Sequence, residues 1–268
     1  MESSLIATRP VIPVAPYLGG KRNLAKTIIQ RLALMPHETY AEAFVGMGGV
    51  FLRRPFKARG EVINDISQDV TTLFRVLQRH YVAFLDMLKW QITSRVEFER
   101  LVAENPDTLT DMERAGRFLY LQRTAFGGKI AGRNFGVSLD GRSARFDITK
   151  LATVLEDVHE RLAGVVIERL PWQAFLARYD RPTTLFYLDP PYYGSEGDYG
   201  PRVFGRPDFE ALAAALAALK GAFMLSLNDR PEVRSIFSRF QIEAVETTYS
   251  VSSARSGRFA EVLITKAS

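Results

Sequence analysis

The sequence contains no cysteine and only three histidines among its 268 residues. Without cysteine, the chain cannot form disulfides, use a thiolate nucleophile or build a cysteine zinc site. The same absence excludes the cysteine-ligated zinc deaminases, a large class of enzymes that act on base amines. The histidines lack the spacing of metal ligands, so we expect no metal site; they are His37, His80 and His159.

Long hydrophobic runs are also missing. No apolar run reaches the roughly 18 residues that a membrane span requires, and the first residues do not resemble a signal peptide. We therefore expect a cytoplasmic protein with no membrane partner, and no feature indicates an obligate protein partner. A hydrophobic content of 47% over 268 residues suits one large α/β domain with an insert.

The most informative segment is Asp189-Pro190-Pro191-Tyr192, which follows an apolar run at residues 185–188. Two prolines cannot donate to a sheet ladder, so they end a strand and stiffen the turn that follows. At such a turn Asp189 and the Pro190 carbonyl can accept hydrogen bonds from an NH₂ group, while the Tyr192 ring can stack on a flat base. We interpret this segment as a site that holds an exocyclic amine; an ordinary capped turn is the alternative.

A pattern typical of cofactor binding lies nearer the N-terminus. A predicted strand at residues 39–44 is followed by Gly46 and Gly48, where the backbone can approach a ligand closely. A second predicted strand, residues 61–65, ends in Asp65 at the spacing that places a carboxylate on the ribose of an adenosine cofactor. A phenylalanine replaces the third glycine of the dinucleotide fingerprint, which argues against a pyrophosphate cofactor. A simple glycine turn is the alternative.

The order of these motifs resembles that of the Dam-type DNA adenine-N6 methyltransferases along nearly the whole chain. The segments that carry the resemblance are Gly19-Gly20-Lys21, Phe44-Val45-Gly46-Met47-Gly48, Asn64-Asp65, residues 118–128, Asp189-Pro190-Pro191-Tyr192, residues 225–229 and residues 261–264. The resemblance implies S-adenosyl-L-methionine as the cofactor and double-stranded DNA as the partner. It also implies an α/β fold, with a Rossmann-like open methyltransferase sheet and a mainly helical target-recognition insert containing a β-hairpin.

The resemblance implies cofactor-binding roles only where the motifs match. These residues are Tyr17 and Lys21 at the methionine end, Phe44, Gly46 and Gly48 in the loop beneath the cofactor, Asp65 on the ribose, Ile66 beside the adenine, and Trp172. Trp172 stands where the family usually has an acid before an aromatic residue, and that acid is missing here. Core packing is therefore an alternative for Trp172, as it is for Phe44, and a solvated helix start is the alternative for Lys21.

The net charge of +5 fits a polyanionic partner, and its distribution is informative. Residues 117–145 carry six basic residues against a single acid, Asp140. The dipeptide Asp140-Gly141 between short alternating runs predicts a β-hairpin, which could reach phosphates and base edges. The segment lies where the family places target recognition, so we expect DNA contacts from Arg123, Lys129, Arg133, Asn134, Arg142 and Arg145. A solvated surface loop is the alternative.

Helical periodicity dominates residues 69–162, which interrupt an alternation of strands and helices. We predict a catalytic domain made of residues 10–68 and 163–268, with residues 69–162 as the target-recognition insert. The glycine-rich residues 193–200 fit either a lid over the site or a simple connector.

Four further segments after the tetrapeptide complete the predicted catalytic domain. We expect a helix at residues 208–220 and strands at residues 223–227, 242–249 and 259–265. These strands would finish an open α/β sheet.

Together, these features predict a site-specific DNA methyltransferase, as found in restriction-modification systems, that acts on the N6 amine of a flipped-out adenine. Because the sulfonium carbon of the cofactor is already electrophilic, the protein mainly has to align the amine. Related alternatives are methylation of cytosine N4, an RNA base or a protein amide. Alternatives of other classes are an inactive DNA-binding relative and a nicotinamide-dependent oxidoreductase.

Overall fold

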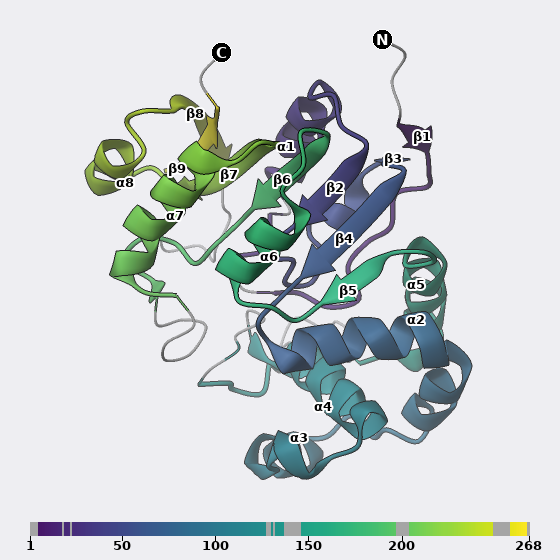
Figure 1. Ribbon diagram of the computed structural model, residues 1–268. Helices are drawn as coiled ribbons and strands as arrows, with labels where there is room; N and C mark the ends of the chain where they lie inside the picture. Colours follow the sequence, from purple (N-terminus) through teal and green to yellow (C-terminus); the bar gives the residue numbers. More distant parts are fainter. Residues whose placement is uncertain are drawn as a thin grey trace.

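The computed structural model describes residues 5–17, 19–21, 23–126, 130, 132–136, 146–196, 204–248 and 258–266. Its centre is a seven-stranded sheet with the strand order β5-β4-β2-β6-β7-β9-β8 (Figure 1). The strands are β2 (Thr39–Glu42), β4 (Gly60–Asn64), β5 (Val166–Glu168), β6 (Thr184–Leu188), β7 (Ala222–Asn228), β8 (Gln241–Thr248) and β9 (Arg258–Thr265). A separate antiparallel pair consists of β1 (Ile6–Ala7) and β3 (Phe56–Lys57).

The connection order of the sheet determines where a ligand can bind. Strands β5, β4, β2, β6 and β7 are parallel, whereas β9 is antiparallel to both β7 and β8. The chain runs outward from β2 through β4 to β5 and then returns with β6 on the other side of β2. In open α/β sheets ligands bind at such a reversal, outside the carboxyl ends of the strands. The predicted α/β sheet is confirmed, and its switch point lies between β2 and β6.

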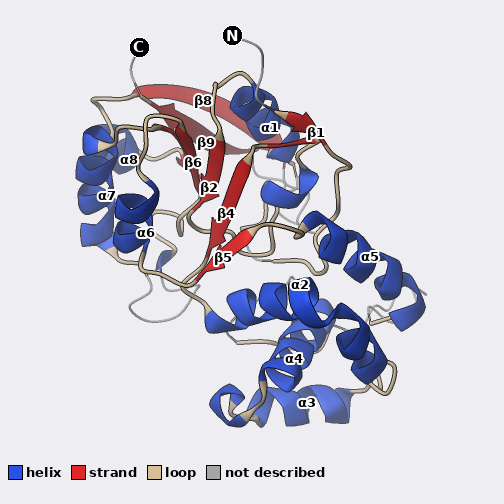
Figure 2. Ribbon diagram, turned by 45° about the vertical axis from the view of Figure 1, so that its right-hand side comes forward, coloured by secondary structure: helices blue, strands red, loops and turns tan. Residues whose placement is uncertain are grey.

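Helices cover both faces of the sheet (Figures 1 and 2). One face packs against α1 (Ala25–Ala33), and the other packs against α6 (Trp172–Tyr179), α7 (Arg206–Ala218) and α8 (Pro231–Ile236). Strand residues alternate between these layers: Tyr187 of β6 belongs to the first core, and its neighbours Phe186 and Leu188 belong to the second. The near-continuous apolar sequence of β6 follows from this two-sided burial.

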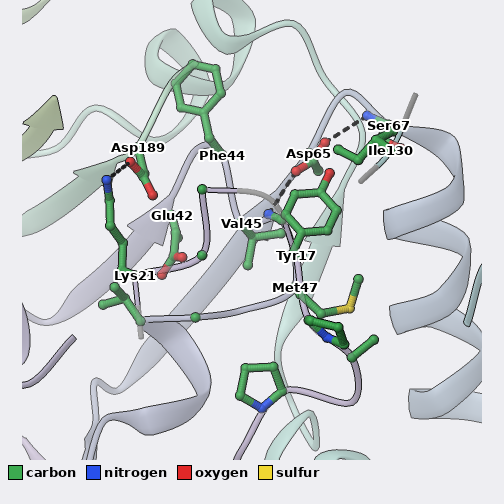
Figure 3. Close-up of a pocket in the computed structure, with 18 of the residues that line it drawn as sticks. Tyr17, Lys21, Glu42, Phe44, Val45, Met47, Asp65, Ser67, Ile130 and Asp189 are labelled. Carbon is green, nitrogen blue, oxygen red and sulfur yellow. Dashed lines mark hydrogen bonds and ion pairs between the residues drawn. The ribbon is translucent and has the colours of Figure 1, made fainter. Parts of the chain in front are cut away.

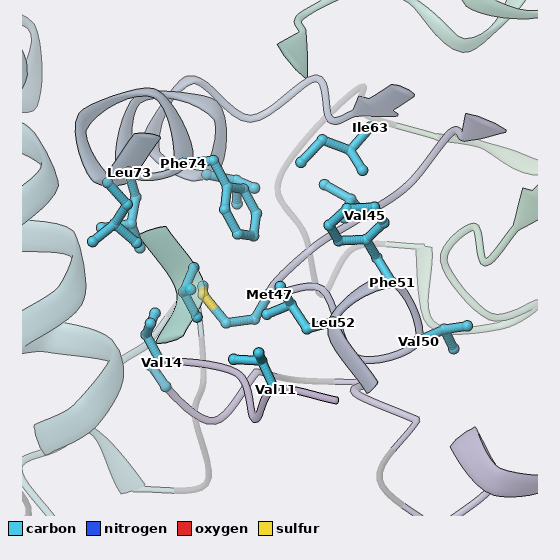
Figure 4. Packing of buried hydrophobic residues seen from close by; sticks show 14 of the residues in the cluster. Val11, Val14, Val45, Met47, Val50, Phe51, Leu52, Ile63, Leu73 and Phe74 are labelled. Carbon is cyan, nitrogen blue, oxygen red and sulfur yellow. The ribbon is translucent and has the colours of Figure 1, made fainter. Parts of the chain in front are cut away.

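The first core continues from the sheet into the helical part of the chain (Figure 4). Phe74 and Leu73 pack with Met47 and Val45 of the glycine loop in one buried cluster. Phe51 starts the short helix η1 (Phe51–Arg53) and is also fully buried there. Burial of one such side chain stabilises the fold by about 1.5–3 kcal/mol. This packing therefore holds the glycine loop in place.

The described residues of the predicted insert form four helices: α2 (Gln68–Leu88), α3 (Arg95–Ala103), α4 (Asp111–Thr124) and α5 (Ile148–Arg161), with the short η2 (Pro106–Thr108) between α3 and α4. They gather beyond the β5 edge of the sheet (Figure 2). Their N-caps are Ser67, Ser94, Thr110 and Asp147, each of which accepts a backbone hydrogen bond. Where the structure describes residues 69–162, they are mainly helical, as predicted. The predicted hairpin around Asp140-Gly141 and residues 197–200 of the predicted lid lie outside the described residues.

Candidate active site

A cavity of about 710 Å³ opens at the switch point of the sheet (Figure 3). This volume is within the range typical of small-molecule sites. Eight of the residues predicted to bind the cofactor or to act in catalysis line it: Tyr17, Lys21, Phe44, Gly46, Asp65, Ile66, Asp189 and Pro191. The structure thus brings the glycine loop, the acid after β4 and the turn after β6 around one space.

The glycine loop after β2 shapes one wall of this cavity. Gly46 has a φ of 50°, and a Cβ placed on it would lie 2.9 Å from a ring atom of Tyr17. Glycine therefore lets the Tyr17 ring pack directly on the loop. Gly48 has a φ of 73°, but its missing Cβ would meet Leu52 in the core. Gly48 therefore supports the loop from beneath and does not line the cavity.

Asp65 ties the glycine loop to the start of α2. One carboxylate oxygen accepts the backbone N–H of Gly46, and the other accepts that of Ser67, both at 2.9 Å. Burial raises the pKa of Asp65 to about 6, against the effect of these two hydrogen bonds. Each oxygen still has a lone pair that can accept a hydrogen bond from a ligand hydroxyl. Ile66 lies beside it, 39% exposed.

Asp189, at the end of β6, belongs to a buried cluster of charged side chains. Its Oδ1 lies 2.9 Å from Nζ of Lys21, and the same Nζ lies 2.9 Å from Oε2 of Glu261. The Lys21 and Glu261 side chains are each 1% exposed, and that of Asp189 is 17% exposed. Lys21 also donates to the hydroxyl of Tyr192. The ammonium of Lys21 is therefore directed at the turn that follows β6.

Strand β7 holds this turn at two points. Ser226 donates from Oγ to Oδ1 of Asp189 at 3.0 Å, and its Oγ is 2.9 Å from the Tyr187 hydroxyl. Two residues further on, Asn228 accepts from the backbone N–H of Tyr193 at 3.0 Å and donates to its carbonyl at 2.9 Å. Residues two apart point to the same side of a strand, so one side of β7 fixes both ends of the turn.

Ionisation of Asp189 is controlled by its surroundings. Burial raises the pKa of Asp189 to about 6, while Lys21 and Ser226 lower it and Glu261 raises it. Perturbed carboxyl groups of this kind cluster at catalytic sites.

Sequence reasoning missed three charged residues of the site. Glu42, at the end of β2, lines the cavity and is 2% exposed; burial raises its pKa to about 8, although it accepts a hydrogen bond from Tyr40 at 2.6 Å. Arg53 also lines the cavity and donates to the Gly49 carbonyl at 2.7 Å. Glu261 is the third. Glu42 and Glu261 are single acids within apolar strand sequences, and that pattern is the signal that could have revealed them.

Trp172 is not part of the cavity lining. It is 6% exposed and packs in the second core, with its ring centroid 6.4 Å from that of Phe204. Phe44 does line the cavity and meets the same Phe204 edge to face, at 5.9 Å. The placement of Trp172 favours the core-packing alternative.

Only three of the predicted DNA contacts lie within the described residues. Arg123 lines the cavity and donates to the Val14 carbonyl at 2.6 Å. Arg133 donates to Oε1 of Gln122 at 2.9 Å, and the carbonyl of Asn134 accepts from a backbone N–H at 2.9 Å. Burial lowers the pKa of both arginines. Lys129, Arg142 and Arg145 lie outside the described residues.

The described residues contain neither a metal-binding group nor a membrane-spanning helix. Among them, no group of three or more histidine, cysteine, aspartate and glutamate side chains is arranged to hold a metal ion. No described helix is both long and apolar enough to cross a bilayer.

The chain is similar to several known proteins. A Type II methyltransferase, M.CviBI of Paramecium bursaria Chlorella virus NC1A, is 21% identical over 88% of this chain and 90% of its own length. Another, M1.LlaDCHI of Lactococcus lactis subsp. cremoris, is 26% identical over 94% of each chain. A solved ribosomal protein L11 methylase of Lactobacillus delbrueckii subsp. bulgaricus has a TM-score of 0.37 and 13% identity, over 91% of this chain and 76% of its own.

The family assignment rests on a match that covers most of the chain. The model of the D12 class of N6 adenine-specific DNA methyltransferases matches residues 17–251. The predicted enzyme class and reaction are confirmed by this match and by the Type II methyltransferase relatives. The chain belongs to the D12 class of N6 adenine-specific DNA methyltransferases, enzymes that methylate adenine at N6 in DNA.

Proposed function

We propose that Asp189 and the Pro190 carbonyl receive the N6 amine of an adenine flipped out of double-stranded DNA, beside S-adenosyl-L-methionine in the cavity. The observation that carries this proposal is the geometry of Asp189. Within the described chain, both polar contacts of its carboxylate are made through Oδ1, which leaves Oδ2 available to accept an N6 hydrogen. The carboxylate lines the same cavity as Asp65 and the glycine loop.

The residues of the cavity fit the cofactor. Gly46 and the Tyr17 ring, in direct contact because Gly46 has no Cβ, both line the cavity, and Asp65 can accept hydrogen bonds from ribose hydroxyls. Ile66 offers an apolar surface to the adenine ring. Because two carboxylates already surround Lys21, we assign the methionine carboxylate to Arg53 on the same cavity wall. S-Adenosylmethionine supplies an electrophilic methyl group to this site.

The chemical task of the protein is to strengthen a weak nucleophile and align it. Hydrogen bonds from N6 to Asp189 and to the Pro190 carbonyl shift electron density onto nitrogen and offset its positive charge as the new bond forms. Alignment of the amine with the methyl group supplies the rest of the acceleration. Tyr192 stacks on the extruded base, with its hydroxyl held by Lys21. The N6 nitrogen bonds to the methyl group as the methyl–sulfur bond breaks, and the excess N6 proton passes to Asp189 or to water.

DNA contacts are assigned to the basic segment of the insert, through Arg123, Lys129, Arg133, Asn134, Arg142 and Arg145. The support is the positive charge of this segment and the position of Arg123 at the cavity. A DNA substrate favours a cytoplasmic location.

Arg133→Ala tests this assignment. If Arg133 contacts a phosphate, its loss should weaken binding to all DNA sequences and reduce the salt slope of the affinity by about one. If it contacts a base, its loss should cost about 1–3 kcal/mol on the preferred site alone. Fluorescence anisotropy across a salt series distinguishes the two, with Arg100→Ala, at an exposed position of α3, as a matched control. Unchanged binding after alanine at Arg133, Arg142 and Arg145 together would place recognition elsewhere.

Product analysis tests the reaction as a whole. DNA incubated with the enzyme and labelled S-adenosylmethionine should yield labelled N6-methyladenine after digestion to nucleosides. Label in N4-methylcytosine, or in RNA alone, would favour the related amine methyltransferases. Cofactor binding without transfer to any nucleic acid would favour an inactive DNA-binding relative, and sequencing of the modified bases would give the target site.

A further inference from the structure

Glu261 lies near the catalytic turn because β9 is antiparallel to β7. Its backbone pairs with Asn228, the last residue of β7, so the first half of β9 lies at the edge of the sheet where the parallel strands end. Glu261 is thereby brought into contact with Lys21, which lies 240 positions earlier in the chain. Glu261 is the acid within the apolar run of β9, and only 1% of its surface is exposed. Nothing in the methyl-transfer geometry above requires this second carboxylate.

The cluster of Lys21, Asp189 and Glu261 has one cation and two carboxylates, and therefore a net charge of −1 when all three are ionised. Without Glu261, Lys21 would face Asp189 alone, and its charge would cancel that of the carboxylate. The N6 amine becomes positively charged during transfer. Cancellation of the cluster's negative charge would therefore remove its favourable interaction with N6 in the transition state. Burial makes this balance matter, because buried charges are screened far less than exposed ones.

We propose that Glu261 is a positioning residue that shares Lys21 with Asp189 and so preserves the net negative charge of the cluster and the strength of Asp189 as a hydrogen-bond acceptor for the target amine. This inference rests on the proposed role of Asp189. Glu261 acts through Lys21 and does not itself touch the amine or the cofactor.

The groups around Asp189 determine how its pKa should change when the Glu261 charge is removed. The groups that act on it or respond to it are Lys21 from the loop before α1, Glu42 from β2, Tyr187 from β6, Ser226 from β7 and Glu261 from β9. Burial raises the pKa of Asp189, Lys21 lowers it, and Glu261 raises it. Removal of the Glu261 charge should therefore lower the pKa of Asp189 and weaken it as a hydrogen-bond acceptor.

The test is the pH profile of single-turnover methyl transfer by Glu261→Gln. We expect the plateau rate constant to fall by roughly 10-fold to 100-fold and the acidic limb to move to lower pH, with the dissociation constant of S-adenosylmethionine within about twofold of wild type. Glu243→Gln on the neighbouring strand β8 is the control, because that glutamate pairs with Arg31 at the surface. The control should match wild type in rate and in pH profile.

A lower rate with an unmoved acidic limb would overturn the proposal, because a purely packing role predicts that result, and so would an unchanged rate. If Glu261→Gln does not fold, Glu261→Asp takes its place, since it keeps the charge. For Glu261→Asp, a rate constant above one-tenth of the wild-type value with an unchanged acidic limb would support the proposal. A loss of methyl transfer by Glu261→Asp as complete as that of Asp189→Asn would overturn it. An active Asp189→Asn variant would instead remove the proposed role of Asp189 itself.

Discussion

Two buried clusters in this enzyme each contain three charged side chains, but their surroundings differ. In the Asp189 cluster, one lysine lies between two carboxylates beside the cavity: Lys21, Asp189 and Glu261. In the Glu61 cluster, one carboxylate lies between two arginines, and no member lines the cavity: Arg54, Glu61 and Arg161. The first has a net charge of −1 and the second a net charge of +1. Access to the cavity and the sign of the excess charge, more than burial itself, distinguish the cluster that we propose to act in catalysis from the cluster that joins two elements of the fold.

Aromatic rings enclose the Glu61 cluster. The guanidinium of Arg54 lies 3.5 Å from the centre of the Tyr40 ring, and that of Arg161 lies 4.1 Å from the centre of the Phe51 ring. Buried N–H groups of both arginines have no hydrogen-bond partner within the described chain. Ring faces offset part of that cost by cation–π attraction. Glu61 accepts from Arg161 through both oxygens, at 2.6 and 3.0 Å, and so joins β4 to α5.

Glu61→Gln should produce the largest change in stability. It leaves two buried cations without a carboxylate, and loss of one partner of a buried ion pair costs about 3–5 kcal/mol. Urea denaturation of the apo-enzyme measures the free energy of unfolding. Surface Glu243→Gln is the control and should change it by at most about 1 kcal/mol. A loss below about 1 kcal/mol for Glu61→Gln would contradict a structural role for this cluster.

Asp65→Ala should affect ligand affinity instead. Ribose hydroxyls would lose a charged acceptor worth about 1.5–3 kcal/mol, which corresponds to a dissociation constant for S-adenosylmethionine about 10-fold to 150-fold higher. Isothermal titration calorimetry measures this constant, and a thermal melt checks that loss of the Gly46 and Ser67 contacts has not unfolded the site. An unchanged constant would remove Asp65 from the cofactor site.

Glu42→Gln should give a smaller effect of opposite sign, a gain of about 1–3 kcal/mol in stability at pH 7. Burial raises the pKa of Glu42 to about 8 from its ordinary 4.5, so the folded state binds a proton that the unfolded state releases. Wild-type stability relative to the variant should therefore fall as pH rises from about 4.5 to 8, and the difference should vanish below pH 4.5. Denaturation curves at several pH values test this, and a gain independent of pH would contradict it.

Sequence could predict the parts of the site that follow apolar strands. Asp189 and Asp65 each stand at a strand end, where parallel topology places a ligand, and their predicted positions match the cavity. Glu261 could not be assigned in the same way, because its role depends on strand pairing and on a residue distant in the sequence. An antiparallel β9 brings Glu261 to the site, and no local pattern reveals that direction.

Trp172 shows the converse problem. Its sequence position suggested the cofactor, but its side chain packs in the second core beside Phe204. Motif spacing locates a backbone segment near a site without revealing toward which side its residues point.

The most direct test of the central claim compares methyl transfer and cofactor binding in Asp189→Ala. If Asp189 holds the target amine, single-turnover transfer to adenine in DNA should fall by at least about 10²–10³-fold. The dissociation constant of S-adenosylmethionine should stay within a few-fold of wild type. A loss of cofactor affinity that matches the loss of transfer, or transfer that persists without the carboxylate, would contradict the claim.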